Sequence, residues 1–354
     1  MDERATAVQL NRRMVDRMVR DGFLTDPAVE AVFRSVLRHR FLPESVPLAK
    51  AYRDAVVTLR SADGSGVLPK GACESSSTMP SLLAQVVSAA NILPGMRILQ
   101  VGTGPGYLVA LVAGLTTAAG YVVTVELDPQ ISAAARDRFA AFGLQQVRAI
   151  HGDGYDGYEQ AAPYDRVLVT AACGELAPAW HRQLREGGQV LLPLVLGQSS
   201  VYPLLVLQKR GAELAGSVVA NLIHVRFVPL QRPSGARPER SDRLRAAVQQ
   251  SLARYLGNSA YPVATLRAIA LYADLELLAS QVAIDRYVPA GDPEQIARAI
   301  TARWQADGAP QVQDCTFCVT FGAAPRSGWR WRFETSGQPV HVYLSRQDQP
   351  KNER

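Results

Sequence analysis

A glycine-rich turn near residue 100 is the part of the sequence most suggestive of chemistry. Residues 98–107 read Ile-Leu-Gln-Val-Gly-Thr-Gly-Pro-Gly-Tyr, an apolar run that ends in three alternating glycines. Glycines are needed where a backbone turns sharply and lets a ligand approach closely. Alone, such a turn suits a dinucleotide, a nucleoside cofactor or no ligand at all. Its candidate cofactor-binding residues are Gly102, Thr103, Gly104, Gly106 and Tyr107.

Acidic residues follow the next two apolar runs and narrow the choice of ligand. Glu126, with Leu127, comes about 20 residues after the turn, where a carboxylate can accept hydrogen bonds from ribose hydroxyls. Asp153 and Gly154 end the following run and suit an adenine amine. The alternative is that Glu126 and Asp153 only cap the helices after them. A nicotinamide enzyme more usually has Gly-x-Gly-x-x-Gly, so we expect S-adenosylmethionine, with S-adenosylhomocysteine as product.

The elements around these residues alternate between strand and helix. That alternation predicts a doubly wound, mostly parallel sheet, an α/β Rossmann-like fold. The expected strands are residues 97–101, 121–126, 146–151, 164–170 and 189–194, and the expected helices are residues 107–115, 129–142 and 178–184.

The segments on either side lack this alternation of strand and helix, and they define the domain organisation. Helical spacing over residues 5–40, a strand candidate at 55–59 and a helix at 81–91 precede the alternating part. Antiparallel strands are expected at 200–209 and 218–228, helices at 244–256, 263–279 and 293–304, and strands at 315–321, 329–333 and 340–344. We therefore predict an N-terminal substrate-shaping segment (1–80), a cofactor-binding domain (81–230), a linker (231–243) and a smaller C-terminal α+β domain (244–354).

Composition excludes several classes of protein. Of the 354 residues, 47% are hydrophobic and 20% charged, which excludes a fibrous or wholly disordered chain. No apolar run approaches the roughly 18 residues that cross a bilayer, and four cysteines make no disulfide framework. The N-terminus carries no secretory signal, so the expected location is cytoplasmic. The net charge of +6 indicates only a modest preference for anionic partners.

Residues 1–230 resemble the protein-L-isoaspartate O-methyltransferase family. The motifs that carry the resemblance are ILQVGTGPGY at 98–107, Val125-Glu126, Gly152-Asp153-Gly154, YDRVLV at 164–169, QLREGGQVLLP at 183–193 and VRFVPL at 225–230. The resemblance implies transfer of a methyl group to an aspartyl or isoaspartyl carboxylate of a peptide or protein. It also implies a serine hydroxyl beside that carboxylate, in a Ser-x-Pro segment. Here Thr78 matches that serine and follows Ser75, Ser76 and Ser77, a departure that adds a methyl group.

Two further departures bear on the substrate. The segment from Tyr52 to the serine run, and the extension over residues 231–354, are similar to divergent relatives encoded with ribosomal peptide natural products. In those relatives an ordinary aspartate is methylated and the ester closes to an aspartimide. We favour such a constrained precursor peptide as substrate. General repair of isoaspartyl proteins is the alternative, and a non-catalytic cofactor-binding scaffold is the alternative of another class.

The methyl transfer that the resemblance implies requires no strong general base. A carboxylate is already ionised at neutral pH (a reference pKa of about 3.9 for aspartate), so catalysis must come mainly from positioning in a dry site. Thr78, assisted by Ser76 and Ser77, is expected to hold the acceptor, and Thr170 to lie near the transferred methyl group. The main chain of the peptide is expected to bind along Val225, Arg226 and Phe227.

The remaining motifs are weaker indications of function. Cys315 and Cys318 have metal-ligand spacing but stand alone in a strand-like run, so no metal is expected. Cys173 is read as structural because no positioned histidine accompanies it. The arginines of residues 232–245 are read as a solvated linker, and residues 329–332 as an amphipathic strand. Nucleic acid is not expected as a partner, because no Asn/Asp-Pro-Pro-aromatic motif follows residue 169.

Overall fold

The computed structural model describes residues 3–60, 75–195, 202–219, 269, 272–273, 275, 293–321, 331–335 and 338–344. Contacts within the chain group it into two compact units. The first comprises residues 1–171 and 179–191, and the second comprises residues 172–178 and 192–354. Each unit is described by itself below, and the predicted linker at 231–243 lies outside the described residues.

Unit 1 is built on parallel strands in the order β5-β4-β3-β6-β7. The residues of β3, β4 and β6 are mostly buried and rich in Val, Leu and Ile, as strands covered on both faces must be, whereas the edge strand β5 is partly exposed. The order reverses direction at β3, and ligands of open α/β sheets bind at such a switch point. The bounds are β3 Arg97–Val101, β4 Tyr121–Glu126, β5 Val147–His151, β6 Tyr164–Val169 and β7 Leu184–Pro193.

The helices of unit 1 start where their sequences allow it. Asp128 caps α6 by accepting hydrogen bonds from the amides of Gln130 and Ile131 at 2.8 and 3.1 Å, and Pro129 occupies the first turn. Asn91 ends α4 in the left-handed conformation. The bounds are α4 Pro80–Ala90, α5 Tyr107–Thr116, α6 Pro129–Ala141 and α7 Pro178–Gln183.

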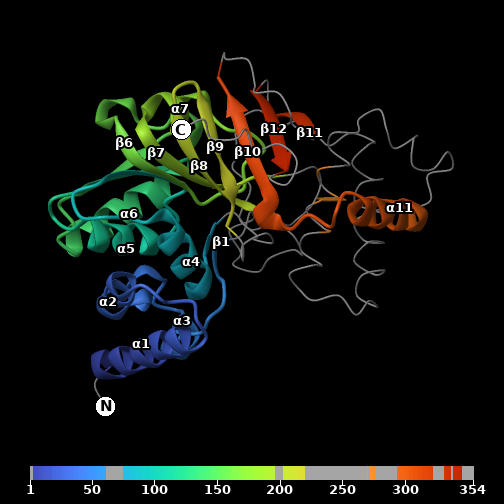
Figure 1. The fold of residues 1–354 in the computed structure, drawn as a ribbon. Coiled ribbons are helices and arrows are strands. Elements are labelled where there is room, and N and C mark those ends of the chain that lie inside the picture. The colour runs from blue at the N-terminus through green and yellow to red at the C-terminus, as the bar shows by residue number, and fades with distance from the viewer. Residues whose placement is uncertain are drawn as a thin grey trace. The chain divides into compact units, whose positions relative to one another are not determined.

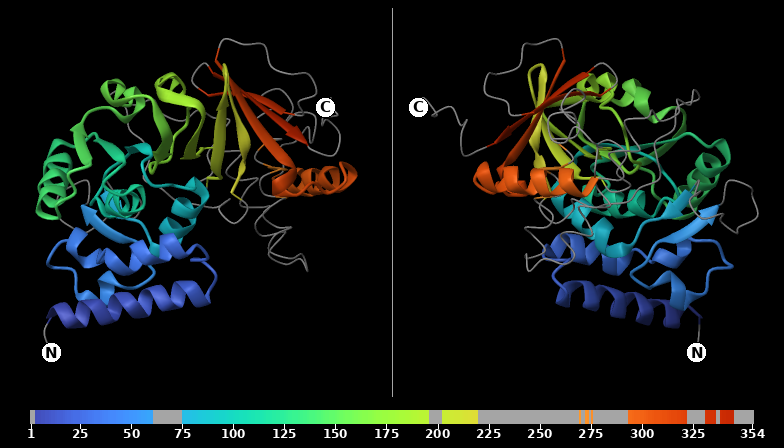
Figure 2. Two further views of the ribbon diagram at one scale, coloured as in Figure 1. Left: turned by 60° about the vertical axis from the view of Figure 1, so that its left-hand side comes forward. Right: turned by 90° about the vertical axis from the view of Figure 1, so that its right-hand side faces the viewer.

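The N-terminal segment forms an additional layer on this core. In Figures 1 and 2, α2 lies against α5 on the side away from the sheet, and α1 lies outside α2. After the short helix α3, two strands, β1 and β2, pair antiparallel, with Val57 opposite Ser77 and Thr58 opposite Ser76. The bounds are α1 Glu3–Arg20, α2 Pro27–Ser35, α3 Leu48–Ala51, β1 Val57–Arg60 and β2 Ser75–Ser77.

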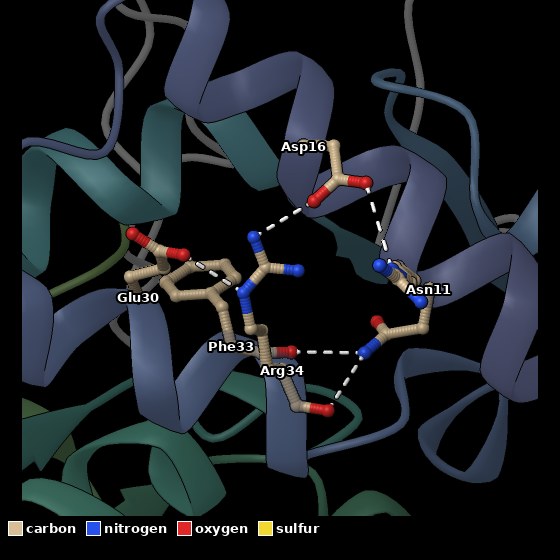
Figure 3. A network of polar contacts seen from close by, with 6 residues as sticks. Asn11, Asp16, Glu30, Phe33 and Arg34 are labelled. Carbon is tan, nitrogen blue, oxygen red and sulfur yellow. Dashed lines mark hydrogen bonds and ion pairs between the residues drawn. The ribbon is translucent and has the colours of Figure 1, made fainter.

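Polar side chains join α1 to α2 (Figure 3). The buried Asn11 amide donates to the carbonyls of Phe33 and Arg34, at 3.1 and 3.0 Å. The Arg34 guanidinium contacts Asp16 and Glu30, each at 2.8 Å. The Asn11 bonds satisfy carbonyls at the end of α2 that have no partner within their own helix.

Unit 2 has an antiparallel sheet in the order β11-β12-β10-β9-β8. The C-terminal strand β10 pairs with β9, so the extension continues the hairpin formed by β8 and β9. The buried ring nitrogen of Trp304, on the helix α11, donates to the Pro310 carbonyl at 2.9 Å. The bounds are β8 Leu204–Arg210, β9 Glu213–Val218, α11 Pro293–Ala306, β10 Cys315–Thr320, β11 Trp331–Thr335 and β12 Gln338–Leu344.

Most predicted elements of the sheet agree with the structure to within one or two residues, and the exceptions are at hairpins and turns. The strand predicted at 189–194 begins at Leu184 instead, ahead of the Gly187-Gly188 pair. The strand that pairs with β8 spans Glu213–Val218, directly after a turn at Gly211, so the strand predicted at 218–228 begins five residues too late. Val219 follows the end of the strand, and residues 220–228 lie outside the described residues. Among the described residues, no helix is long and apolar enough to cross a membrane.

Candidate functional site

The carboxyl ends of β3, β4, β5 and β6 form one aligned edge. The amide of Gly102 donates to the carbonyl of Val125, and that of Thr170 donates to Val101, both at 2.9 Å. The amide of Gly152 donates to the Glu126 carbonyl at the same distance. The predicted glycine turn, Glu126 and the segment at Asp153 therefore lie along one edge of the sheet, which begins with the turn at the point where the strand order reverses.

The glycine turn has a backbone that other residues would adopt only with strain. Gly102, Gly104 and Gly106 have φ angles of 88°, 51° and 87°. A Cβ on Gly106 would lie 2.7 Å from the Phe139 ring, so this glycine also lets α6 pack beside the turn. At Gly104 the nearest atom to such a Cβ is the carbonyl oxygen of Ser76, at 3.6 Å. The turn therefore lies in contact range of strand β2.

A buried network of hydroxyl and amide groups supports the turn from below. The Gln100 amide donates to the Gly102 carbonyl at 2.6 Å and to Thr170 Oγ1 at 2.8 Å. Its oxygen accepts a hydrogen bond from Thr124, and Thr124 contacts the Thr103 hydroxyl at 2.7 Å. The hydroxyls of Thr103 and Thr170 are thus engaged within this network.

Glu126 and Asp153 accept hydrogen bonds from different parts of the chain. Glu126 Oε2 accepts from the Gly104 amide at 3.0 Å, and Oε1 accepts from the Asp128 amide at 3.2 Å. Glu126 is therefore not the cap of α6, and it fixes the turn itself. Asp153 accepts from the Tyr155 amide at 2.8 Å and does cap a short 3-10 helix at 154–156, as the alternative reading of the sequence held. Leu127 is exposed and Gly154 buried, and Trp180 donates to the Gly154 carbonyl at 2.8 Å.

The hydroxyl run alternates between buried and partly exposed positions. Ser75 and Ser77 are buried, whereas Ser76 and Thr78 are partly exposed, as a short strand followed by an extended residue requires. Ser77 is 1% exposed, and its hydroxyl accepts from the Arg38 guanidinium at 3.3 Å. Ser76 and Thr78 are thus the members of the run that can reach a ligand.

Arg38 organises the segment around this run, and the sequence analysis did not predict its role. Its side chain is fully buried. Nη1 donates to the carbonyls of Ala51 and Arg53, at 3.0 and 3.1 Å. Nη2 donates to the carbonyls of Ala55, Ser77 and Thr78, at 3.0, 3.3 and 3.0 Å. One side chain therefore joins the segment before β1 to the end of β2.

Asp54 and Tyr107 complete the surroundings of Arg38. The Asp54 carboxylate accepts from the Ser81 amide at 2.9 Å, at the start of α4. Tyr107 is buried against Phe33 and Phe41, and burial raises the pKa of its phenol above the usual range. Its ring is part of the contact between α5 and the N-terminal layer, and its predicted role in cofactor binding stays a prediction.

Some predicted residues cannot be placed. Val225, Arg226 and Phe227 lie outside the described residues. Gln100, Arg38 and Asp54 are the residues that sequence reasoning missed at the site. A polar residue in the apolar run of β3 could have indicated Gln100 as a partner for neighbouring strands. No comparable signal indicates Arg38, whose partners come from segments up to 40 residues away.

The Rossmann-like sheet and its edge define a protein of the S-adenosylmethionine-dependent methyltransferase class. The family model described as protein-L-isoaspartate(D-aspartate) O-methyltransferase (PCMT) matches residues 9–235. The chain belongs to this family. It is therefore an S-adenosylmethionine-dependent protein (iso)aspartate O-methyltransferase, as the resemblance implied.

Curated relatives support this assignment. The chain is 37% identical over 225 residues to the protein-L-isoaspartate O-methyltransferase of a Picosynechococcus species, an alignment that covers 63% of this chain and 91% of the relative. It is 36% identical over 236 residues to the protein of the same name from Methylorubrum populi, covering 67% and 99% of the two chains.

Solved structures share the fold. One named protein-L-isoaspartate O-methyltransferase aligns over 95% of this chain and 99% of its own, with a TM-score of 0.62 and 22% identity. A Plasmodium falciparum protein described as a putative member, solved with S-adenosyl-L-homocysteine, covers 62% of this chain and 98% of its own. Its TM-score is 0.50 and its identity is 20%. Because the first alignment spans 95% of the chain, it includes most of the C-terminal extension.

The groups at the sheet edge fit this cofactor. A carboxylate oxygen has two lone pairs, and each Glu126 oxygen uses one of them for a backbone amide. The remaining lone pairs can accept from a ribose diol. The glycines leave the turn without side chains that would keep a ligand from its backbone.

Proposed function

We propose that this enzyme methylates the free carboxylate of isoaspartyl residues in polypeptides, and that the methylation takes place between the glycine turn and the Ser76–Thr78 segment. The observation that carries the proposal is the approach of these two segments, 3.6 Å between the Ser76 carbonyl and the Cβ position of Gly104. One segment has the features of a nucleoside cradle, and the other presents hydroxyl groups. A methyl donor and an acceptor bound to them would be neighbours.

The cofactor-binding residues follow from the sheet edge. Glu126 would accept from the ribose, and Gly102, Gly104 and Gly106 would admit the amino-acid part of the cofactor to the main chain. Asp153, whose Oδ1 accepts from Tyr155, would accept from the adenine amine through its second oxygen, with Leu127 and Gly154 beside the ring. Thr103, Thr170 and Tyr107 would contribute by holding the turn in shape. When bound, S-adenosylmethionine supplies a methyl group activated by a sulfonium.

The acceptor needs orientation more than activation. An ionised carboxylate is already a nucleophile, so Thr78 and Ser76 would donate hydrogen bonds that fix one oxygen and leave the other free to attack. Thr78 is also more restricted at χ1 than serine. Ser77 acts through its position, since its hydroxyl is buried on Arg38. Val225, Arg226 and Phe227 remain our candidates for binding the main chain of the peptide.

The methyl ester then closes without a further catalytic group. The backbone nitrogen of the following residue attacks the ester carbonyl. The new N–C bond forms as the bond to methoxide breaks, and the nitrogen's proton leaves with the methoxide as methanol. The product is a five-membered succinimide, which water can open to aspartyl or isoaspartyl forms.

A precursor peptide with an ordinary aspartate is the second candidate substrate. The observation that favours it is Thr78, which stands where the family usually has serine. The C-terminal extension does not distinguish the two, because a solved structure named protein-L-isoaspartate O-methyltransferase aligns over 95% of this chain. We therefore place isoaspartyl polypeptides first. The thiols of Cys173 and Cys315, which form no disulfide among the described residues, support a reducing compartment such as the cytoplasm.

Methyl transfer to matched peptides tests the proposal. Three unrelated sequences would each be made with isoaspartate, aspartate or isoasparagine at one position and incubated with labelled cofactor. We expect one methyl group per isoaspartyl peptide in all three sequences, and little on the aspartyl forms. Cofactor binding without transfer to any isoaspartyl peptide would refute the proposal. Efficient transfer to aspartate in a single cyclic or otherwise constrained peptide would favour the precursor substrate.

A further inference from the structure

Arg38 places a buried positive charge beside the acceptor segment, and every partner it has among the described residues is neutral. Its guanidinium donates to five main-chain carbonyls and to the Ser77 hydroxyl. No carboxylate of the described residues lies within ion-pair distance of it. By contrast, Arg34 on the same N-terminal layer contacts two carboxylates. The charge of Arg38 is thus hydrogen-bonded but not neutralised by contact.

A buried charge without an ionic partner is expensive, because burial removes its hydration. Burial lowers the pKa of Arg38, although a guanidinium stays protonated in proteins. Asp54 attracts the charge from a longer distance, but its carboxylate is exposed and hydrogen-bonded to Ser81. Solvent therefore weakens that attraction. The region around the Arg38 guanidinium therefore keeps a net positive charge.

The excess charge lies next to the residues that hold the acceptor. Nη2 donates to the carbonyls of both Ser77 and Thr78, so the guanidinium contacts the main chain of the residue whose hydroxyl is expected to hold the acceptor. A carboxylate bound by the partly exposed Thr78 would be attracted by this charge, with a strength between that in water and that in a protein interior. We infer that Arg38 is a positioning and specificity residue for the acceptor: it fixes the Ser77–Thr78 backbone and supplies the charge that favours a carboxylate over a neutral amide. This inference rests on the proposed function.

A purely structural role makes a different prediction. Arg166 provides the comparison, since it is also buried and donates to main-chain carbonyls, those of Ala90 and Asn91, at 2.6 and 3.1 Å. It lies near the start of β6, whereas Thr170 follows the end of that strand. Three to four residues of strand separate the two by more than 10 Å. Removing either arginine should destabilise the fold, but only Arg38 should change which acceptor is bound.

The experiment compares Arg38→Lys and Arg38→Met with Arg166→Lys and Arg166→Met. Folding is checked by circular dichroism, and affinity for S-adenosylhomocysteine by calorimetry. The Kd of an isoaspartyl peptide and of the matched isoasparaginyl peptide is then measured, together with kcat for the isoaspartyl peptide. The ratio of the two Kd values reports the preference for a carboxylate and cancels a general loss of binding.

We expect Arg38→Lys to keep cofactor affinity and most of the carboxylate preference, because it keeps the charge. Its kcat should fall at least tenfold, because three donors cannot replace the fork that holds five carbonyls. Arg38→Met should lose the preference by on the order of tenfold, the effect of one charge at this range. Both Arg166 variants should keep the wild-type ratio and a kcat within about threefold of wild type.

Two results would overturn the inference. One is a wild-type kcat in Arg38→Lys, and the other is an unchanged Kd ratio in a folded Arg38→Met. If Arg38→Met does not fold, Arg38→Lys decides through its kcat and its Kd ratio. The proposed function fails separately, when the wild-type enzyme transfers no methyl group to any isoaspartyl peptide.

Discussion

The carboxylate of Glu126 accepts a hydrogen bond from the backbone amide of Gly104 at 3.0 Å. A residue at the end of β4 thereby holds the turn that follows β3, and the two strands are neighbours in the sheet. The group expected to bind the ribose and the turn expected to receive the cofactor are thus one rigid arrangement. The Glu126 carboxylate also accepts from Asp128, at the start of α6.

Replacing Glu126 should weaken cofactor binding more than it weakens the fold. Glu126→Gln keeps an oxygen for Gly104 but loses the charge that strengthens such bonds, so we expect about a tenfold loss of affinity for S-adenosylhomocysteine by calorimetry. Glu126→Ala should lose more. Asp128→Asn is the matched control, since asparagine still caps α6 and should leave the affinity unchanged. Equal affinity in Glu126→Ala and wild type would remove Glu126 from the site.

Alanine should be tolerated very differently at two glycines of the same turn. At Gly104 the added methyl group meets only the Ser76 carbonyl at 3.6 Å, so the cost is the left-handed backbone, about 1–2 kcal/mol. At Gly106 the methyl group would also lie 2.7 Å from Phe139, which should add another 1–3 kcal/mol or so. Urea denaturation measures both. The double variant Gly106→Ala, Phe139→Leu should cost less than the sum of its parts, and strict additivity would contradict the clash.

Adjacent serines should separate stability from catalysis. Ser77→Ala removes a buried acceptor of Arg38 and should cost about 1 kcal/mol in the free energy of unfolding, with a fall in kcat. Ser76 is partly exposed, so Ser76→Ala should leave the unfolding midpoint within experimental error and raise the KM for an isoaspartyl peptide. Denaturation and initial-rate assays test this pair. The reverse pattern, with Ser76 controlling stability, would contradict the alternation seen in β2.

The network joining α1 and α2 should matter for stability alone (Figure 3). Asn11 is buried and donates to two carbonyls, so Asn11→Ala should cost about 1–3 kcal/mol. The Arg34 ion pairs are partly exposed, and Arg34→Met should cost no more than about 1 kcal/mol and less at high salt. Thermal unfolding at two salt concentrations distinguishes the two. The Kd for S-adenosylhomocysteine serves as the control and should not change in either variant.

The buried thiols predict a loss of stability in alkali. Burial raises the pKa of the Cys315 thiol from 9.0 to about 12. The folded state therefore holds this proton where the unfolded chain has released it, and the stability gained is complete below pH 9 and lost between pH 9 and pH 12. Cys315→Ala should flatten that part of the curve of unfolding free energy against pH.

In a Cys73→Ser background, thiol reagents at pH 8 should label Cys173, Cys315 and Cys318 only after unfolding.

The regular part of the molecule could be predicted because local and global preferences agree there. Strands β3 and β4 are apolar runs ended by glycine or an acidic residue, and their predicted bounds match the structure. The segment before α4 follows no period. Its shape depends on Arg38, whose partners are main-chain carbonyls that carry no side-chain signal in a sequence. Strand β7 was predicted to begin at residue 189 after a helix ending at residue 184, whereas Leu184 already pairs with Tyr164.

The candidate site shows the same division. The glycines of the turn and the acidic residue at the end of β4 could be located from residue type and spacing alone, and their binding roles stay predictions. The sequence could not show which hydroxyl groups are already hydrogen-bonded within the protein, because that depends on partners from distant segments. The cofactor contact of Thr103 stays a prediction, and the structure adds that its hydroxyl contacts Thr124 and that Gln100 links Thr124 to the turn. Four serine and threonine residues in a row look equivalent in the sequence, but Ser77 is already committed to Arg38.

The approach of Ser76 to Gly104 has a thermodynamic consequence. A ligand that orders either segment restrains the other, so the second ligand to bind has less conformational entropy to remove. Donor and acceptor should therefore bind with positive cooperativity, and linkage requires the enhancement to be mutual. The enzyme would then release its products in stages, because departure of one loosens the contacts of the other.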